Sequence, residues 1–227
     1  MREEKHTVII RIEISTLINR DGKINRRKMD RLAMVLTNLH NSGKNILIVS
    51  SGAIVLGADK LNLQQLPENM GDMQAVAAVG QAELIRNYQN SFDDYNQIVA
   101  QVLLTSDIIS YQQRVENTRN TFNTLLDMNI IPIINENDAV SPTDIEIDDN
   151  YPLALIVAKI AQADFIVIKM DPDGKYLIIP RGKDKGIVVD SEIELQEKIE
   201  SLCSIMVKAD RIEEGMFPSS IGEIVFG

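Results

Sequence analysis

Residues 26–49, RRKMDRLAMVLTNLHNSGKNILIV, indicate the class of fold because they join a helical pattern to a buried strand. Apolar residues at three- and four-residue spacing, from Met29 to Leu39, predict an amphipathic helix over residues 26–42. Gly43 is a typical helix stop. The short apolar run at residues 46–49 is typical of a strand buried on both faces in a parallel sheet.

The same alternation of strands and helices continues in both directions along the chain. Further strands are predicted at residues 8–12, 99–104, 130–134 and 165–168, and further helices at residues 73–92, 118–128 and 153–161. Residues 176–179 and 186–189 predict a hairpin, a Ser191–Glu194 capping box opens a helix to about residue 203, and residues 224–226 predict an edge strand. The alternation predicts an α/β fold with a mainly parallel sheet between helices.

Composition limits the kinds of partner. The chain has 227 residues, 44% of them hydrophobic, and we expect a single domain over residues 1–227. A net charge of −10 argues against nucleic acid or an anionic membrane as the main partner. No apolar run approaches the roughly 20 residues that span a bilayer. The single cysteine, Cys203, suits the reducing cytoplasm. His6 and His40 lack metal-ligand spacing, so we expect both at the surface and predict no metal site.

In parallel sheets ligands bind outside the carboxyl ends of the strands, so the segments that follow the strands are candidate sites. Val49-Ser50-Ser51-Gly52 follows a strand with small residues that let backbone N–H groups approach a ligand; a plain strand-to-helix turn is the alternative. Asn135-Glu136-Asn137-Asp138 could hold the ammonium and carboxylate groups of an amino acid; an Asx-type turn is the alternative.

Two acidic segments have simpler alternatives. Residues 144–150, DIEIDDN, could bind a cation or an ammonium group, or could form a solvated hairpin. Residues 171–174, DPDG, are a turn signal first and lack the remaining ligands of a calcium loop.

Five ordered motifs resemble those of one family. They are VSSGAI at residues 49–54 with Gly57, AAVGQ at 77–81, QVLLT at 101–105, NTRNT at 117–121 and IPIINENDA at 131–139. With these motifs the chain resembles the glutamate 5-kinase family, within the amino-acid kinase superfamily, from residue 8 to about residue 176. The resemblance implies a three-layer αβα sandwich with a mainly parallel central sheet.

The resemblance also implies an activity. Members transfer the γ-phosphoryl group of MgATP to the side-chain carboxylate of L-glutamate, the first step of proline biosynthesis, and proline often inhibits them. It implies a homo-oligomer, either a dimer or a tetramer. The family's optional C-terminal RNA-binding-like domain is not expected, because the sequence stops at Gly227.

Particular positions follow from matching the family's motifs to this sequence. The substrate-binding positions fall on Ser51, Asn135, Asp138 and Asn150. The usual catalytic lysine position holds Arg11, and the nucleotide-binding positions fall on Ser15 and Asp171.

The chain departs from the family's pattern at phosphate-handling positions. Where members begin with Lys-x-Gly-Thr/Ser-Ser, this chain has Arg11, Glu13 and Ile14 in place of the lysine, the glycine and the first hydroxyl residue. The last aspartate of Gly-Asp-Asn-Asp is replaced by Tyr151, and the threonine of Thr-Asp by Met170. A carboxylate about 4 Å from a phosphate charge costs roughly 4 kcal/mol at an effective dielectric near 20, so Glu13 is the costliest replacement.

The family's late glycine-rich segment, which ends in a lysine, has two alternative alignments. Either residues 214–216 are its remnant and Ser219 occupies the lysine position, or the segment is deleted and residues 222–226 align with the final strand. Three hypotheses follow: a working kinase in which Arg11 clamps the phosphates, a degenerate relative that senses glutamate or proline, and a partner-binding protein with a vestigial pocket.

Overall fold

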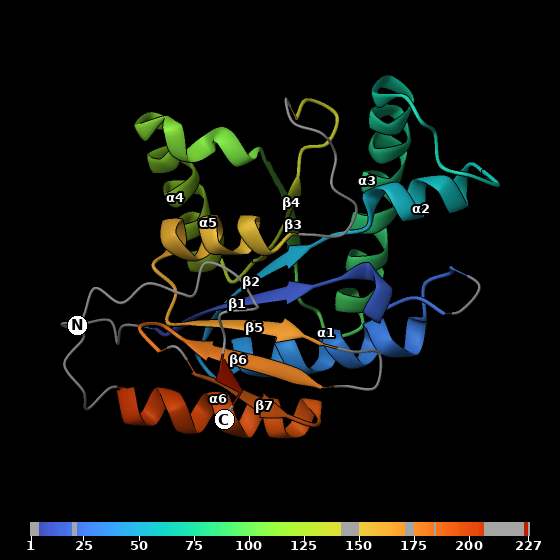
Figure 1. Cartoon of the computed structure of the whole chain (residues 1–227). Coiled ribbons are helices and arrows are strands. Elements are labelled where there is room, and N and C mark those ends of the chain that lie inside the picture. The colour runs from blue at the N-terminus through green and yellow to red at the C-terminus, as the bar shows by residue number, and fades with distance from the viewer. Residues whose placement is uncertain are drawn as a thin grey trace.

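The computed structural model describes residues 5–19, 22–141, 150–170, 175–183, 185–206 and 225–226. The strands are β1 (Thr7–Ile12), β2 (Asn45–Ser50), β3 (Val99–Leu104), β4 (Ile131–Glu136), β5 (Phe165–Lys169), β6 (Tyr176–Pro180), β7 (Lys185–Val189) and β8 (Val225–Phe226). These described strands form one eight-stranded sheet in the order β3-β4-β2-β1-β5-β6-β7-β8 (Figure 1).

The sheet is mainly parallel, as predicted. Strands β1 to β5 pair in parallel through β3–β4, β4–β2, β2–β1 and β1–β5. Strand β6 runs antiparallel to both β5 and β7, which confirms the predicted hairpin, and β8 pairs in parallel with β7 at the edge. We call the side on which β1 to β5 end the carboxyl edge of the sheet, and the side on which they begin the amino edge.

The helices form two layers, one on each face of the sheet. They are α1 (Arg26–Asn41), α2 (Ala53–Lys60), α3 (Met70–Asp93), α4 (Gln112–Asp127), α5 (Tyr151–Ala161) and α6 (Glu192–Met206), with short 3-10 turns η1 (Ile14–Thr16) and η2 (Ser106–Ser110). Apolar residues of α1, α3 and α6 pack with Ile10 in one core cluster, and those of α4 and α5 pack with Ile9 in the other. Figure 1 shows α4 and α5 on one side of the sheet and α1 and α6 on the other, so the three-layer prediction is confirmed.

Two glycines bring α2 and α3 into unusually close contact. A Cβ added at Gly80 would lie 2.7 Å from the backbone nitrogen of Gly57 and closer still to the carbonyl group of Ala53. At the start of α2, Gly52 has a φ of 101°, a conformation that glycine adopts readily, and the side chain of Ile14 fills the space where its Cβ would lie. The turn after β2 is therefore held in place against both α3 and η1.

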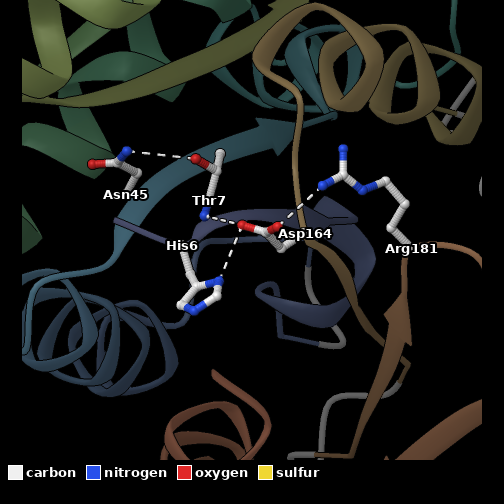
Figure 2. A network of polar contacts seen from close by, with 5 residues as sticks. All are labelled: His6, Thr7, Asn45, Asp164 and Arg181. Atoms are coloured by element: carbon white, nitrogen blue, oxygen red, sulfur yellow. Dashed lines mark hydrogen bonds and ion pairs between the residues drawn. The ribbon is translucent and has the colours of Figure 1, made fainter. Parts of the chain in front are cut away.

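The expectation that both histidines lie at the surface is wrong. His6 is 5% exposed and His40 is 6% exposed. Figure 2 shows the reason for His6: its Nδ1 lies 3.3 Å from Asp164 Oδ2, which also accepts the Thr7 backbone N–H at 2.9 Å. Arg181 Nη2 donates to Asp164 Oδ1 at 3.2 Å. One buried carboxylate thus joins the beginnings of β1 and β5 to the end of β6 at the amino edge.

Burial also affects the second histidine. The pKa of His40 is lowered from its ordinary value, first by burial and then by the nearby charge of Lys5. The folded protein therefore favours the neutral imidazole of His40. Across the described residues, a helix of the length and hydropathy needed to cross a membrane is not found.

Candidate active site

The carboxyl edge brings together segments that are far apart in the sequence. Because β1 to β5 are parallel, the residues that follow them all emerge on the same side of the sheet. Hydrogen bonds join these segments: the Ser51 N–H donates to the Ile12 carbonyl at 3.2 Å, and the Asn137 N–H donates to the Leu104 carbonyl at 2.7 Å. These hydrogen bonds hold the segment after β2 against the end of β1, and the segment after β4 against the end of β3.

Two of the predicted substrate positions, Asn135 and Asn150, are hydrogen-bonded to each other, and Asn150 also binds the backbone beside a third, Ser51. Asn150, immediately before α5, donates from Nδ2 to Asn135 Oδ1 at 2.8 Å and also to the Ser50 carbonyl. The Oγ of Ser51 accepts the Ile14 backbone N–H at 3.3 Å. Both Ser51 and Asn135 are almost fully buried. Amide and hydroxyl groups thus lie at the ends of β2 and β4, where the amide nitrogen of Asn135 and the hydroxyl of Ser51 can donate to a carboxylate.

A tyrosine lies beneath this cluster. The hydroxyl of Tyr88, on α3, is 2.9 Å from Ser50 Oγ, and the ring is fully buried. Burial raises the pKa of Tyr88 to about 12, and the hydrogen bond with Ser50 acts in the opposite direction. The neutral phenol is therefore part of the structure that supports the Ser50–Ser51 turn.

Asp138, the fourth predicted substrate position, is held by residues of α3 and β3. Gln81 Nε2 donates to the Glu136 carbonyl at 3.0 Å and to Asp138 Oδ2 at 3.5 Å. Gln101 Nε2 in turn donates to Gln81 Oε1 at 3.3 Å. Burial raises the pKa of Asp138, although the hydrogen bond from Gln81 partly offsets this. A cation that bound beside this carboxylate would relieve the cost of keeping it ionised.

Glu136 adds a second carboxyl group to the same edge. Its Oε1 accepts the Ser106 backbone N–H at 3.2 Å and the Ser141 hydroxyl at 3.3 Å. Burial raises the pKa of Glu136, and the charges of Asp138 and Asp107 raise it further. Two carboxyl groups whose ionised forms are both disfavoured lie next to the amide cluster, which makes this part of the edge suited to a positively charged group such as an ammonium.

Arg11 is placed by the end of β1 and is 3% exposed. Its Nη1 lies 2.6 Å from Glu13 Oε1, and its Cζ lies 6.0 Å from the centre of the Tyr151 ring. Ser15, a predicted nucleotide position, is exposed and donates from Oγ to Glu13 Oε2 at 3.5 Å. Arg11 is therefore close to two other departures from the family's pattern, at positions 13 and 151. The pairing of Arg11 with Glu13 was not predicted, because each was considered as a separate replacement in the family's motif.

Lys169 is a second buried cation at the carboxyl edge that the sequence analysis did not select. It is the last residue of β5 and 4% exposed, and β5 pairs directly with β1. Its Nζ donates to the Tyr176 hydroxyl at 3.3 Å and lies 4.0 Å from Glu192 Oε1. The sequence does contain a pattern that could have identified it: a lysine directly follows the apolar run 165–168. Its partners on β6 and α6 carried no signal, because nothing in the sequence placed them beside it.

Other predicted positions lie outside the described residues. These are Asp171, Ser219, the segment 144–149 and the alternative glycine-rich remnant at 214–216. In the described ranges, no group of three or more histidine, cysteine, aspartate or glutamate side chains is arranged to hold a metal ion.

Comparisons with known proteins identify the family. The model of the amino acid kinase family matches residues 15–216. Glutamate 5-kinase of Enterococcus faecalis is 42% identical over 201 residues, which cover 87% of this chain and 74% of that protein. Glutamate 5-kinase of Clostridium perfringens is 38% identical over 202 residues, covering 87% of this chain and 75% of that protein.

Solved structures give the same fold. The structure of Giardia carbamate kinase matches with a TM-score of 0.53 and 15% identity, over 75% of this chain and 74% of that chain. Carbamate kinase from Giardia lamblia bound to AMP-PNP matches with a TM-score of 0.51 over the same shares, also at 15% identity. At this identity the likeness supports the fold alone.

Proposed function

Because the chain belongs to the amino acid kinase family, and within it to the glutamate 5-kinases, we propose that it phosphorylates the side-chain carboxylate of L-glutamate with MgATP. One observation carries the proposal: Asn150 is hydrogen-bonded to Asn135 and to the Ser50 carbonyl next to Ser51, and the half-buried carboxylate of Asp138 lies three residues after Asn135 on the same segment. An amino acid needs hydrogen-bond donors for its carboxylate and a negatively charged acceptor for its ammonium group, and this edge of the sheet supplies both.

We assign the amino-acid end of the substrate to these four side chains. Asp138 pairs with the substrate ammonium, because burial disfavours the free carboxylate and an opposite charge compensates it. Ser51 and the amide nitrogen of Asn135 donate hydrogen bonds to substrate carboxylate oxygens. Asn150, whose two amide hydrogens are held by Asn135 Oδ1 and the Ser50 carbonyl, offers its amide oxygen to the substrate ammonium. Gln81 positions Asp138 and does not itself contact the substrate.

The residues at the end of β1 suit a nucleotide phosphate. A buried guanidinium binds phosphate oxygens through paired N–H groups, and Arg11 supplies one. The carboxylate of Glu13, which pairs with Arg11, would repel a bound phosphate. When bound, MgATP supplies the phosphoryl group, and its metal ion neutralises part of the phosphate charge. Arg11 would stabilise the charge that develops on the transferred group, and Ser15 and Asp171 remain proposed nucleotide contacts.

Further properties are proposed on the strength of the family. We propose a homo-oligomer, dimer or tetramer, with proline as a regulatory ligand of the glutamate site. A single cysteine that needs no disulfide partner supports a cytoplasmic location. The chain is proposed to act as one catalytic domain over residues 1–227.

Glutamate-dependent release of ADP from MgATP, with hydroxylamine trapping of the acyl phosphate, tests the proposed function. The wild type should release ADP only when glutamate is present. Asp138→Asn should abolish the signal, whereas Asp59→Asn, an exposed site on α2, should leave it unchanged. If glutamate raised the melting temperature but no ADP were released, the chain would be a glutamate-binding relative instead. If glutamate had neither effect, the substrate assignment would be wrong.

A further inference from the structure

A buried arginine at the carboxyl edge already has an anionic partner within the chain. Arg11 is 3% exposed, and its Nη1 lies 2.6 Å from Glu13 Oε1. The aromatic ring of Tyr151 lies within 6.0 Å of the guanidinium carbon. A guanidinium taken out of water is stable in the fold only with a close counter-ion, so Glu13 is part of what allows Arg11 to be buried here.

The two members of this pair differ in freedom. The Glu13 side chain is 33% exposed, whereas that of Arg11 is 3% exposed. Glu13 precedes η1 with an extended backbone, and its side chain makes no capping hydrogen bond to that turn. Its contact with Ser15 Oγ, at 3.5 Å, is long. The carboxylate of Glu13 can therefore turn into solvent once another anion pairs with Arg11, while the guanidinium stays enclosed.

We propose that Glu13 is an internal counter-ion that competes with the nucleotide phosphates for Arg11. This inference rests on the proposed function, because it assigns a regulatory contact to the same site. Without nucleotide, Glu13 neutralises Arg11 and keeps the site closed to anions. With nucleotide, a phosphate oxygen takes the place of the carboxylate, and Glu13 turns outward. The pair makes nucleotide affinity lower than Arg11 alone would give.

Binding of MgAMP-PNP, measured by titration calorimetry, tests the competition without turnover. Glu13→Gln should bind MgAMP-PNP about fivefold to tenfold more tightly than the wild type. This is the low end of the effect that Coulomb's law gives for removing a partly exposed negative charge beside a phosphate. Glu116→Gln, an exposed residue of α4, removes the same charge elsewhere and should leave the affinity unchanged. Without nucleotide, Glu13→Gln should also melt at a lower temperature than the wild type, because the ion pair between Arg11 and Glu13 is lost.

A second variant tests the competition with the negative charge retained. Glu13→Asp shortens the side chain by one methylene group, so its carboxylate reaches Arg11 less well. Competition for Arg11 predicts tighter MgAMP-PNP binding than in the wild type although the net charge is unchanged. This conservative change also provides a test if Glu13→Gln does not fold.

The outcomes distinguish this inference from the proposed function. A wild type that phosphorylates glutamate, with both Glu13 variants binding MgAMP-PNP within twofold of it, would overturn the inference and leave the function standing. If neither the wild type nor the variants bound MgAMP-PNP at millimolar concentration, both would be wrong. Tighter binding by both variants, with Glu116→Gln unchanged, would support the inference.

Discussion

The contact between α2 and α3 leads to a quantitative prediction for Gly80→Ala. The new Cβ would lie 2.7 Å from the backbone nitrogen of Gly57 and closer to the carbonyl of Ala53, and neither backbone atom can rotate away. The helices must separate by about 1.5 Å to bring the Ala53 carbonyl oxygen to van der Waals distance, and overpacking of this kind costs roughly 3 kcal/mol. Alanine regains about 1 kcal/mol through its higher helix propensity. We therefore expect a net loss of about 2 kcal/mol, or a melting temperature lower by about 4–8 °C.

The same separation should weaken function. Helix α2 begins directly after Ser51 and Gly52, and α3 carries Gln81, so moving the helices apart displaces two sides of the glutamate site. A displacement of about 1 Å can cost up to 100-fold in rate, and we expect kcat/KM for glutamate to fall at least tenfold.

Thermal and urea denaturation, with initial-rate kinetics, measure both effects. Gly71→Ala in the first turn of α3 is the matched control, since its nearest atom would be Asn69 Oδ1 at 3.7 Å. That variant should be as stable as the wild type or more stable, with unchanged kinetics. A Gly80→Ala protein that melted at or above the wild-type temperature would refute the packing argument.

Three further predictions follow from the buried ionisable groups. Because burial raises the folded-state pKa of Asp138, the free energy of unfolding falls as the pH rises from about 4 through that pKa. Asp138→Asn should therefore melt at a higher temperature than the wild type at pH 7 and lose this advantage below about pH 4. In calorimetry the same variant should fail to bind glutamate. Asp164→Ala removes the acceptor of the buried Thr7 N–H, and urea denaturation should show a loss of about 2–4 kcal/mol. The pKa of His40 is lowered in the fold, so its contribution to the free energy of unfolding is complete above about pH 6.5 and decreases as the pH drops towards the folded-state pKa. His40→Gln should therefore lose less stability than the wild type between about pH 7 and pH 5.

The sequence predicted the sheet well because its central strands are buried on both faces. Residues 46–49 and 165–168 are wholly apolar, and such runs are distinctive. The helices were predicted less accurately at their ends. Helix α4 begins at Gln112, six residues before the predicted start, because its first turns are mostly polar and exposed and so lack an apolar period. Helix α2 was not predicted, since the glycines that let it pack against α3 are also typical of a turn.

The parts of the site that depend on strand ends were predictable, and those that depend on helix contacts were not. Parallel strands explain why Ser51 and Asn135 lie near each other, since Ser51 directly follows β2 and Asn135 lies near the end of the adjacent strand β4. The Arg11–Glu13 pair could also have been found, because residues two apart in a strand face the same side. The contact between Lys169 and Glu192 joins a strand to a helix beyond a hairpin, and no local pattern encodes it.

The aromatic residues of the site give the protein an intrinsic optical signal. The sequence has five tyrosines and no tryptophan, so near-ultraviolet absorbance and emission come from tyrosine. Tyr151 lies beside the guanidinium of Arg11, and Tyr88 is hydrogen-bonded to Ser50. Nucleotide binding that moves Glu13 should alter the emission of Tyr151 without any label. In an alkaline spectrophotometric titration, Tyr88 should ionise near pH 12, so its late absorbance change would report whether the core beneath the site is intact.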